Sequence, residues 1–432
     1  MSEVLVVVGP GVVADAGLLA EIAEREFAAL GVLGRIEHAR DAAHLLSLTN
    51  TPPNTENTAS PTTNAASPAD APVSADGSRR ADALWRAGDG AVVILPGPTS
   101  EVRGLITEPL GLSRRPVVWV DVERVDGVTP GEGATHLHGR GIGGLAWGIR
   151  HAVHRVRHPS QRIAYGPERE QWGDLYRPDL SDRLDRPDRG GRVPVVALIH
   201  GGYWRSIWAA DIMEALCADL AGRRLAVWNL EYRRPDLHGW QATISDVSAG
   251  LSALTDLVPA AAELDLSRVA VAGHSAGAQL ALRAAADGSR MSLAVSLAGV
   301  LDLVEGDRRW LSSGAVAAAL GHPAPTGHQG TSGHHAPTGP DGGAGGARGQ
   351  AADVYAGASP LLRVPLHVRQ LIVQGTADDL DLVDFSRRYA AAAREAGDEV
   401  TYLEMLGDHF DVITPTSPIW QATAEAIVRA LA

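Results

Sequence analysis

The stretch RVAVAGHSAGAQLALRAA, residues 268–285, joins a valine-rich run to an alanine- and leucine-rich segment through Gly-His-Ser-Ala-Gly. The first run predicts a buried strand, and the last segment predicts a helix. Gly273 and Gly277 flank a turn that lifts the hydroxyl of Ser275 out of the sheet. The N-terminus of the following helix favours negative charge that develops beside this hydroxyl. The pattern indicates a nucleophilic serine between a strand and a helix.

Apolar runs on both sides of this stretch alternate with helical patterns. This alternation predicts a mostly parallel, doubly wound α/β sheet, in which functional groups gather at the carboxyl ends of the strands. The other expected strands are 193–200, 224–232, 293–299, 370–375 and 399–405. The expected helices are 209–222, 241–258, 276–286 and 383–396.

The region before residue 160 contains a smaller α/β pattern, which predicts a small, parallel, flavodoxin-like sheet. We therefore expect two domains, 1–158 and 159–432. Each domain is expected to carry one disordered, low-complexity insertion, at 47–80 and at 321–350. The expected strands of the first domain are 3–9, 91–97 and 116–122, and its expected helices are 18–31 and 143–156. The second insertion contains four histidines, for which a solvated loop is favoured over a metal site: His322, His328, His334 and His335.

A serine nucleophile needs a base and an acid that orients the base. After Ser275, acidic residues follow the strand 370–375, and a histidine follows the strand 399–405. We expect His409 to be the base. Asp378, the first acid beyond the turn, is the preferred third member, and Asp379 is the alternative.

The segment HGGYWRS, residues 200–206, ends another expected strand. Its glycines let backbone N–H groups approach a substrate oxygen without an intervening Cβ, as an oxyanion hole requires. The N–H of Ala276, the residue after the nucleophile, would supply a further donor. The expected loop donors are Gly201, Gly202 and Tyr203, and the expected walls of the substrate pocket are Trp204 and Trp208.

Composition narrows the function classes. The net charge of −13 argues against a nucleic-acid partner, and the single cysteine, Cys217, excludes an intramolecular disulfide or a cysteine-based zinc cluster. We expect no metal and no cofactor. The N-terminus lacks a basic segment before its short apolar run, and the chain contains no apolar stretch long enough for a membrane span. We therefore expect a cytoplasmic protein that acts on a small-molecule substrate.

Residues 165–432, apart from 321–350, resemble kynurenine formamidases (arylformamidases) and related esterases of the α/β-hydrolase family. The segments that carry the resemblance are YGPEREQWGDLYRP (165–178), HGGYW (200–204), GHSAGAQLA (273–281), SLAGVLDL (296–303), ASPL (358–361) and GDHFDVI (407–413). The resemblance implies an α/β-hydrolase sheet, the triad Ser275, Asp378 and His409, and hydrolysis of N-formylkynurenine to kynurenine and formate. Because related enzymes with the same loop cleave short-chain esters, a carboxylesterase acting on small aryl or alkyl esters is the alternative.

The first domain resembles type II 3-dehydroquinate dehydratases at VLVVVGPG (4–11), AVVILPGP (91–98), RPVVWVDV (115–122) and HGRGIGGLAWGIRHAV (138–153). It departs from that family at functional positions: Gly11 and Leu95 stand where the family has asparagine, and Asp121 stands where it has histidine. We therefore expect a degenerate relative retained for assembly, through a homo-oligomer, or for ligand binding. A third interpretation is an assembly or ligand-sensing protein with residual hydrolase activity.

Overall fold

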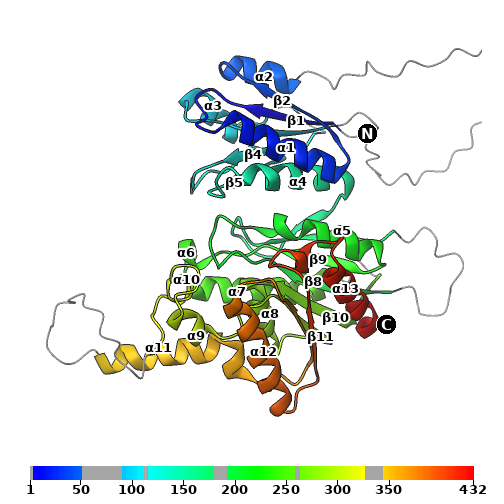
Figure 1. Ribbon diagram of the computed structural model, residues 1–432. Coiled ribbons are helices and arrows are strands. Elements are labelled where there is room, and N and C mark those ends of the chain that lie inside the picture. The colour runs from blue at the N-terminus through cyan, green and yellow to red at the C-terminus, as the bar shows by residue number, and fades with distance from the viewer. Residues whose placement is uncertain are drawn as a thin grey trace, which may run out of the picture. The chain divides into compact units, whose positions relative to one another are not determined.

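The computed structural model describes residues 3–50, 90–110, 112, 115–179, 192–257, 263–325 and 344–432. The chain divides into two compact units, Met1–Arg157 and His158–Ala432. This boundary falls one residue before the expected one. Each unit is built on its own sheet (Figure 1).

The first unit contains a five-stranded sheet in the order β2-β1-β3-β4-β5, in which every neighbouring pair is parallel. This order is that of flavodoxin-like folds, so the expected class is confirmed for this unit. Its strands are β1 (Glu3–Val8), β2 (Leu33–His38), β3 (Ala91–Leu95), β4 (Val117–Asp121) and β5 (Ala134–His138). Its helices are α1 (Ala16–Leu30), α2 (Ala42–Asn50), α3 (Ser100–Gly104) and α4 (Gly144–Arg157), with a 3-10 turn at Leu105–Thr107.

Helices cover both faces of this small sheet. Apolar side chains of α1 and α4 pack on one face with Val4, Val6 and Val8 of β1. Leu45 of α2 packs on the other face, together with α3. Because both faces are covered, β1, β3 and β4 are buried along nearly their whole length and appear in the sequence as continuous apolar runs.

The second unit contains an eight-stranded sheet in the order β13-β12-β11-β10-β8-β9-β7-β6. Its neighbouring strands pair in parallel, except that β7 is antiparallel to both β9 and β6. The strands are β6 (Gln161–Ala164), β7 (Trp172–Tyr176), β8 (Val193–Ile199), β9 (Ala226–Leu230), β10 (Leu264–His274), β11 (Leu293–Leu297), β12 (Arg369–Gly375) and β13 (Val400–Met405). The expected doubly wound sheet is confirmed.

Helices also cover both faces of the second sheet (Figure 1). Leu254 of α7, Leu280 of α8 and Phe385 of α12 share one apolar core. Helices α5 and α13 are joined by the Trp420 indole N–H, which donates to Asp219 at 2.8 Å. The helices are α5 (Glu214–Gly222), α6 (Pro235–His238), α7 (Trp240–Leu257), α8 (Ala276–Ala286), α9 (Leu303–Arg308), α10 (Ala315–Leu320), α11 (Ala344–Ala358), α12 (Leu380–Glu395) and α13 (Pro418–Leu431). Short 3-10 turns lie at Ala210–Met213, Pro360–Arg363 and Asp411–Ile413.

Both expected insertions need correction at their edges. Residues 47–50 belong to α2, which is anchored by buried Leu45 and by the Thr49 hydroxyl that donates to the Leu46 carbonyl at 3.0 Å. Residues 344–350 belong to α11, whose buried Ala351 and Tyr355 hold the helix against the core. At the other edge of the second insertion, residues 321–325 are also described: Gly321 caps α10, and Ala324 is buried and donates its N–H to Asp307 at 2.7 Å. The rest of the two expected insertions, 51–80 and 326–343, lies outside the described residues.

The structure also contains four strands that the sequence analysis did not predict: β2, β5, β6 and β7. In β7 the pattern is interrupted by Asp174, which is buried because Arg162 of β6 pairs with both of its oxygens at 2.8–2.9 Å. No helix within the described ranges is both long and apolar enough to cross a membrane.

Candidate active site

Ser275 occupies the tight turn between β10 and α8. Its φ of 55° lies in the left-handed region, which is strained for a residue other than glycine, and its side chain is buried. A Cβ on Gly273 would overlap the Gly277 carbonyl group, and a Cβ on Gly277 would overlap the Ile199 and His200 carbonyl oxygens of the neighbouring strand. The two glycines therefore permit the close packing that the turn needs, as the sequence pattern predicts.

The loop that follows β8 lies directly against this turn. A Cβ on Gly201 would lie 2.7 Å from the His274 carbonyl oxygen and 3.0 Å from Ser275 Cβ. The Gly201 carbonyl group is turned toward His200, whose Nδ1 lies 2.8 Å from it. In a trans peptide the N–H points opposite to the carbonyl group, so the Gly202 N–H points away from the His200 ring. Ala276 begins α8, so its N–H has no acceptor within the helix.

A buried ionic group fixes His200 at the start of this loop. His200 Nε2 lies 3.2 Å from Glu231, and the His200 carbonyl oxygen accepts a hydrogen bond from the Tyr232 hydroxyl at 2.9 Å. Glu231 also pairs with Arg234 and accepts from the Ala210 N–H. Burial by itself would raise the pKa of Glu231, but the positive charge of Arg234 and the contact with His200 outweigh it and lower the pKa to about 2. The loop thus starts from a rigid, ionised anchor.

Asp378 and His409 form a direct pair. His409 Nδ1 lies 3.0 Å from Asp378 Oδ2, and the Asp378 side chain is only 2% exposed. Gln374 donates to the same carboxylate oxygen at 2.9 Å, and the Asp379 N–H donates to the other at 2.7 Å. The alternative acid, Asp379, is instead the N-cap of α12, where its side chain accepts from the Asp381 N–H. The structure therefore favours Asp378.

His274, the residue before the serine, holds the His409 loop against the serine turn. Its Nε2 lies 3.0 Å from the His409 carbonyl oxygen, and the centroids of the two rings are 4.7 Å apart. Burial, followed by the effect of His409, lowers the pKa of His274 well below its usual value, so this ring is neutral and donates through Nε2. Ser275, His409 and Asp378 are thereby brought to one end of the sheet.

Backbone contacts tie the turn that carries the acid to the loop that carries the histidine. The Thr376 N–H donates to Met405 at 2.8 Å, and the Ala377 N–H donates to Gly407 at 2.9 Å. Asp408 closes the histidine loop by accepting from the N–H of Phe410 at 2.8 Å and of Asp411 at 2.9 Å. The Asp378–His409 distance therefore depends on hydrogen bonds at the ends of β12 and β13.

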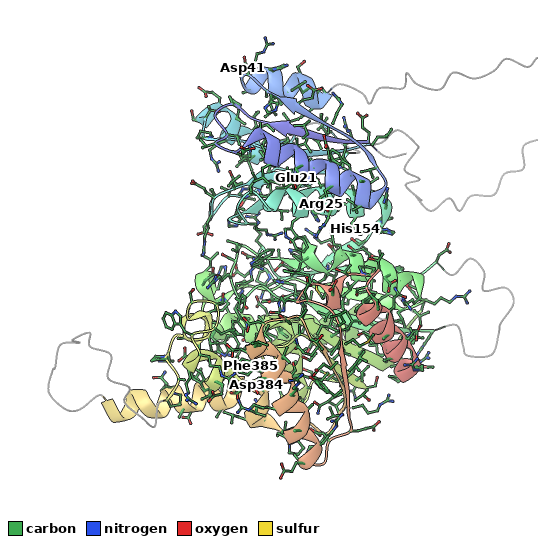
Figure 2. The ribbon with its side chains drawn as sticks, viewed as in Figure 1. Glu21, Arg25, Asp41, His154, Asp384 and Phe385 are labelled. Carbon is green, nitrogen blue, oxygen red and sulfur yellow. The ribbon has the colours of Figure 1, made fainter. Side chains whose placement is uncertain are left out.

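The turn between α9 and α10 links the loop after β8, residues 200–206, to the helix that follows Asp378. Arg205 donates to the Ser312 carbonyl oxygen at 2.8 Å. At the other side of the turn, Arg309 pairs with Asp381 at 2.8 Å and with Asp384 at 2.7 Å, and its guanidinium lies over the Phe385 ring of α12. Asp384 and Phe385 are neighbours on this helix (Figure 2). This turn thus braces the two halves of the site from outside the sheet.

The aromatic residues of the loop take different positions. Trp204 was expected to wall the pocket, but it is 2% exposed, belongs to the core, and donates through its indole N–H to Gln279 at 3.0 Å. Trp204 is therefore a packing residue. Trp208 is partly exposed and lies against Gly202. Tyr203 is also partly exposed, and burial together with the negative charges of Asp379 and Asp378 raises its pKa.

Two contributors to the site were missed by the sequence analysis. Gln374 stands in the apolar run LIVQG, and Glu231 stands at the end of the run AVWNLE. A polar residue at the carboxyl end of a buried strand is the available signal, because such a residue must find a buried partner. The identity of that partner depends on strand order, which the sequence does not give.

Comparisons with known proteins found one family model and several solved structures that are similar to part of the chain. A family model described as BD-FAE matches residues 184–388, a range that includes Ser275 and Asp378 and ends before His409. No curated protein matches the chain. Among solved structures, a truncated carbohydrate esterase from gut microbiota is similar at 17% identity and a TM-score of 0.50, covering 63% of this chain and 96% of that one.

Two other solved structures are similar over the same share of this chain. A bacterial heroin esterase has 19% identity and a TM-score of 0.47, covering 63% of this chain and 83% of that one. The bifunctional GH43-CE protein from Bacteroides eggerthii has 18% identity and a TM-score of 0.48, covering 63% of this chain and only 35% of that one. From the strand order, the serine turn, the family match and the carbohydrate esterase together, we conclude that His158–Ala432 is an α/β-hydrolase enzyme unit.

Proposed function

We propose that the chain is a serine carboxylesterase that cleaves small acyl esters. The observation that carries this proposal is the approach of three features at one end of the sheet: the strained Ser275 turn, the Gly201 loop against it, and the His409–Asp378 pair. The family match and the similar carbohydrate esterase support an ester, rather than another acyl compound, as the substrate class.

In the proposed mechanism, His409 Nε2 takes the proton of the Ser275 hydroxyl while Ser275 Oγ attacks the acyl carbon. The Gly202 and Ala276 N–H groups donate to the oxygen that becomes negative in the tetrahedral intermediate. His409 then returns its proton to the leaving alcohol, and the acyl-enzyme forms. A water molecule, deprotonated by His409, attacks the acyl carbon; the bond to Ser275 Oγ then breaks, His409 returns the proton to Ser275 Oγ, and the acid is released. Asp378 holds the His409 ring in the tautomer that has its proton on Nδ1 and its free pair on Nε2.

Hydrolysis of an aryl formamide, with N-formylkynurenine as the substrate, is the second candidate. It is favoured by the HGGYW loop and by the segment GDHFDVI around the proposed base, on which the resemblance to kynurenine formamidases rests. The same nucleophile, base and oxyanion donors would serve this reaction, because a formamide also passes through a tetrahedral intermediate.

The test compares kcat/KM for p-nitrophenyl acetate, butyrate and hexanoate with kcat/KM for N-formylkynurenine. The carboxylesterase proposal expects ester turnover well above the formamide rate, and a formamide rate at least equal to the best ester rate would overturn it. Ser275→Ala should abolish both activities and the covalent labelling by a fluorophosphonate probe. Labelling that persists in this variant would show that another residue is the nucleophile.

A further inference from the structure

The first unit contains a pocket of its own, which the hydrolase chemistry does not use. It lies where the loops after β1, β3 and β4 meet, and its volume is about 410 Å³. In the strand order β2-β1-β3-β4-β5, β2 is added on one side of β1, and β3 and the later strands are added on the other side. Open parallel sheets bind ligands at the carboxyl ends of their strands beside such a change of side.

The lining of this pocket is mostly apolar. Ten of its thirteen residues are glycine, valine, leucine or proline, and three are charged: Arg103, Asp121 and Glu123. Pockets of this volume accept small organic molecules, and an apolar lining with a few fixed charges suits a ligand with an apolar body and a compact polar head. The charged residues then decide which polar head fits.

Arg103 is held in a defined orientation. Its Nη1 and Nη2 donate to the two oxygens of Asp121 at 2.8 and 3.0 Å, and Nη1 also lies 3.3 Å from the Gly97 carbonyl oxygen. His136 Nε2 contacts Asp121 at 2.7 Å, so the carboxylate has partners on both oxygens. Among the described residues, Arg103 has no partner for its Nε–H or its second Nη2–H. These two donors lie on one edge of the guanidinium, which is the geometry that binds a carboxylate.

Glu123 supplies the complementary charge. It is exposed at the pocket, and its carboxylate makes no hydrogen bond or ion pair with another described residue. The pocket therefore offers a cationic edge at Arg103 and a separate free carboxylate at Glu123. An anion alone would use only the first of these groups, and a cation alone would use only the second.

We propose that this pocket binds a free α-amino acid with an apolar or aromatic side chain. The carboxylate of the amino acid pairs with the free edge of Arg103, its ammonium group pairs with Glu123, and its side chain lies against the valines and prolines of the wall. This binding site is distinct from the proposed esterase site and does not depend on it.

The experiment measures binding to the full chain by isothermal titration calorimetry with three probes that share one ring: L-phenylalanine, 3-phenylpropionate and 2-phenylethylamine. 3-Phenylpropionate lacks the ammonium group, and 2-phenylethylamine lacks the carboxylate. L-Phenylalanine should bind about tenfold more tightly than either analogue, because each analogue loses one ion pair. Equal binding of an analogue, or no binding of L-phenylalanine at about 10 mM, would overturn the proposal.

Two variants test the proposed roles of Glu123 and Arg103 separately. Glu123→Gln should weaken L-phenylalanine about fivefold and leave 3-phenylpropionate unchanged, since Glu123 meets only the ammonium group. Arg103→Lys keeps the charge beside Asp121 but removes the free edge, so it should weaken both L-phenylalanine and 3-phenylpropionate and leave 2-phenylethylamine unchanged. Equal loss of all three probes in either variant would contradict the assignment.

Two controls separate this site from the rest of the chain. Glu21→Gln removes an exposed carboxylate of α1 that does not line the pocket (Figure 2) and should leave binding unchanged. Ser275→Ala removes the proposed esterase nucleophile and should also bind L-phenylalanine normally. Loss of binding in Ser275→Ala would place the amino acid at the hydrolase site and overturn the proposal. Because esterase activity is measured separately, failure of one proposal is distinguishable from failure of the other.

Discussion

Gly201→Ala tests whether the HGGYW loop supplies the oxyanion donors. The added Cβ would lie 2.7 Å from the His274 carbonyl oxygen and 3.0 Å from Ser275 Cβ. Relief of the first contact requires the loop to move from 2.7 to about 3.4 Å, a displacement of about 0.7 Å. Neither the Ser275 turn nor the loop after β8 can shift easily. The turn is closely packed at Gly273 and Gly277, and His200, which begins the loop, is held by Glu231.

A displacement of about 0.7 Å lengthens a donor–oxyanion distance of about 2.9 Å to about 3.6 Å, which is no longer a hydrogen bond. Loss of one oxyanion donor lowers kcat by about 10²–10³, equivalent to about 3–4 kcal/mol of transition-state stabilisation. KM should change much less, because the ground-state carbonyl oxygen carries little charge. The effect should therefore appear in kcat.

The assay is kcat and KM for p-nitrophenyl butyrate, with the concentration of intact sites titrated by a fluorophosphonate probe. Gly222→Ala is the matched control: a Cβ there meets no atom within 4 Å, so this variant should retain wild-type kcat. The reasoning would be refuted if Gly201→Ala had the wild-type unfolding temperature and a kcat within about threefold of wild type.

Three further predictions concern the proposed acid Asp378, Glu231 at the start of the loop after β8, and Phe410 beside His409. Asp378→Asn should lower kcat about 10⁴-fold by stabilising the wrong tautomer of His409. Asp379→Asn should keep kcat within about threefold and change thermal unfolding little, because asparagine caps a helix as well as aspartate does. The opposite order of kcat losses would exchange the roles of the two acids. The pKa of Glu231 is lowered to about 2 in the folded state, so its ionisation stabilises the fold above about pH 5. As the pH falls toward 2, the free energy of unfolding should decrease by on the order of 3 kcal/mol. Urea unfolding of Glu231→Gln should lack this component, and a pH profile parallel to that of wild type would contradict the assignment. Phe410 is 43% exposed, and its ring centroid lies 5.5 Å from that of His409. If Phe410 contacts the acyl chain, Phe410→Ala should raise KM about three- to tenfold for p-nitrophenyl hexanoate and less for the acetate. Equal changes in KM for the two esters would exclude this contact.

The sequence predicted those parts of the fold that depend on local pattern. Buried parallel strands are continuous apolar runs, so β1, β3, β8 and β10 could be recognised without knowledge of their neighbours. The strands β2 and β6 are partly exposed and polar, and β7 contains Asp174, whose burial is explained only by Arg162 on the paired strand. A pattern that depends on a partner elsewhere in the chain cannot be read locally.

For the hydrolase site, the sequence by itself determined the serine turn, because the spacing of Gly273, Ser275 and Gly277 is dictated by contacts within a few residues and with one adjacent strand. The tertiary structure favours Asp378 over Asp379 as the proposed acid, since only the Asp378 carboxylate contacts His409 while the Asp379 side chain caps a helix. It also placed Trp204 in the core. These outcomes depend on side-chain direction and on strand order, which are properties of the assembled sheet and not of any single segment.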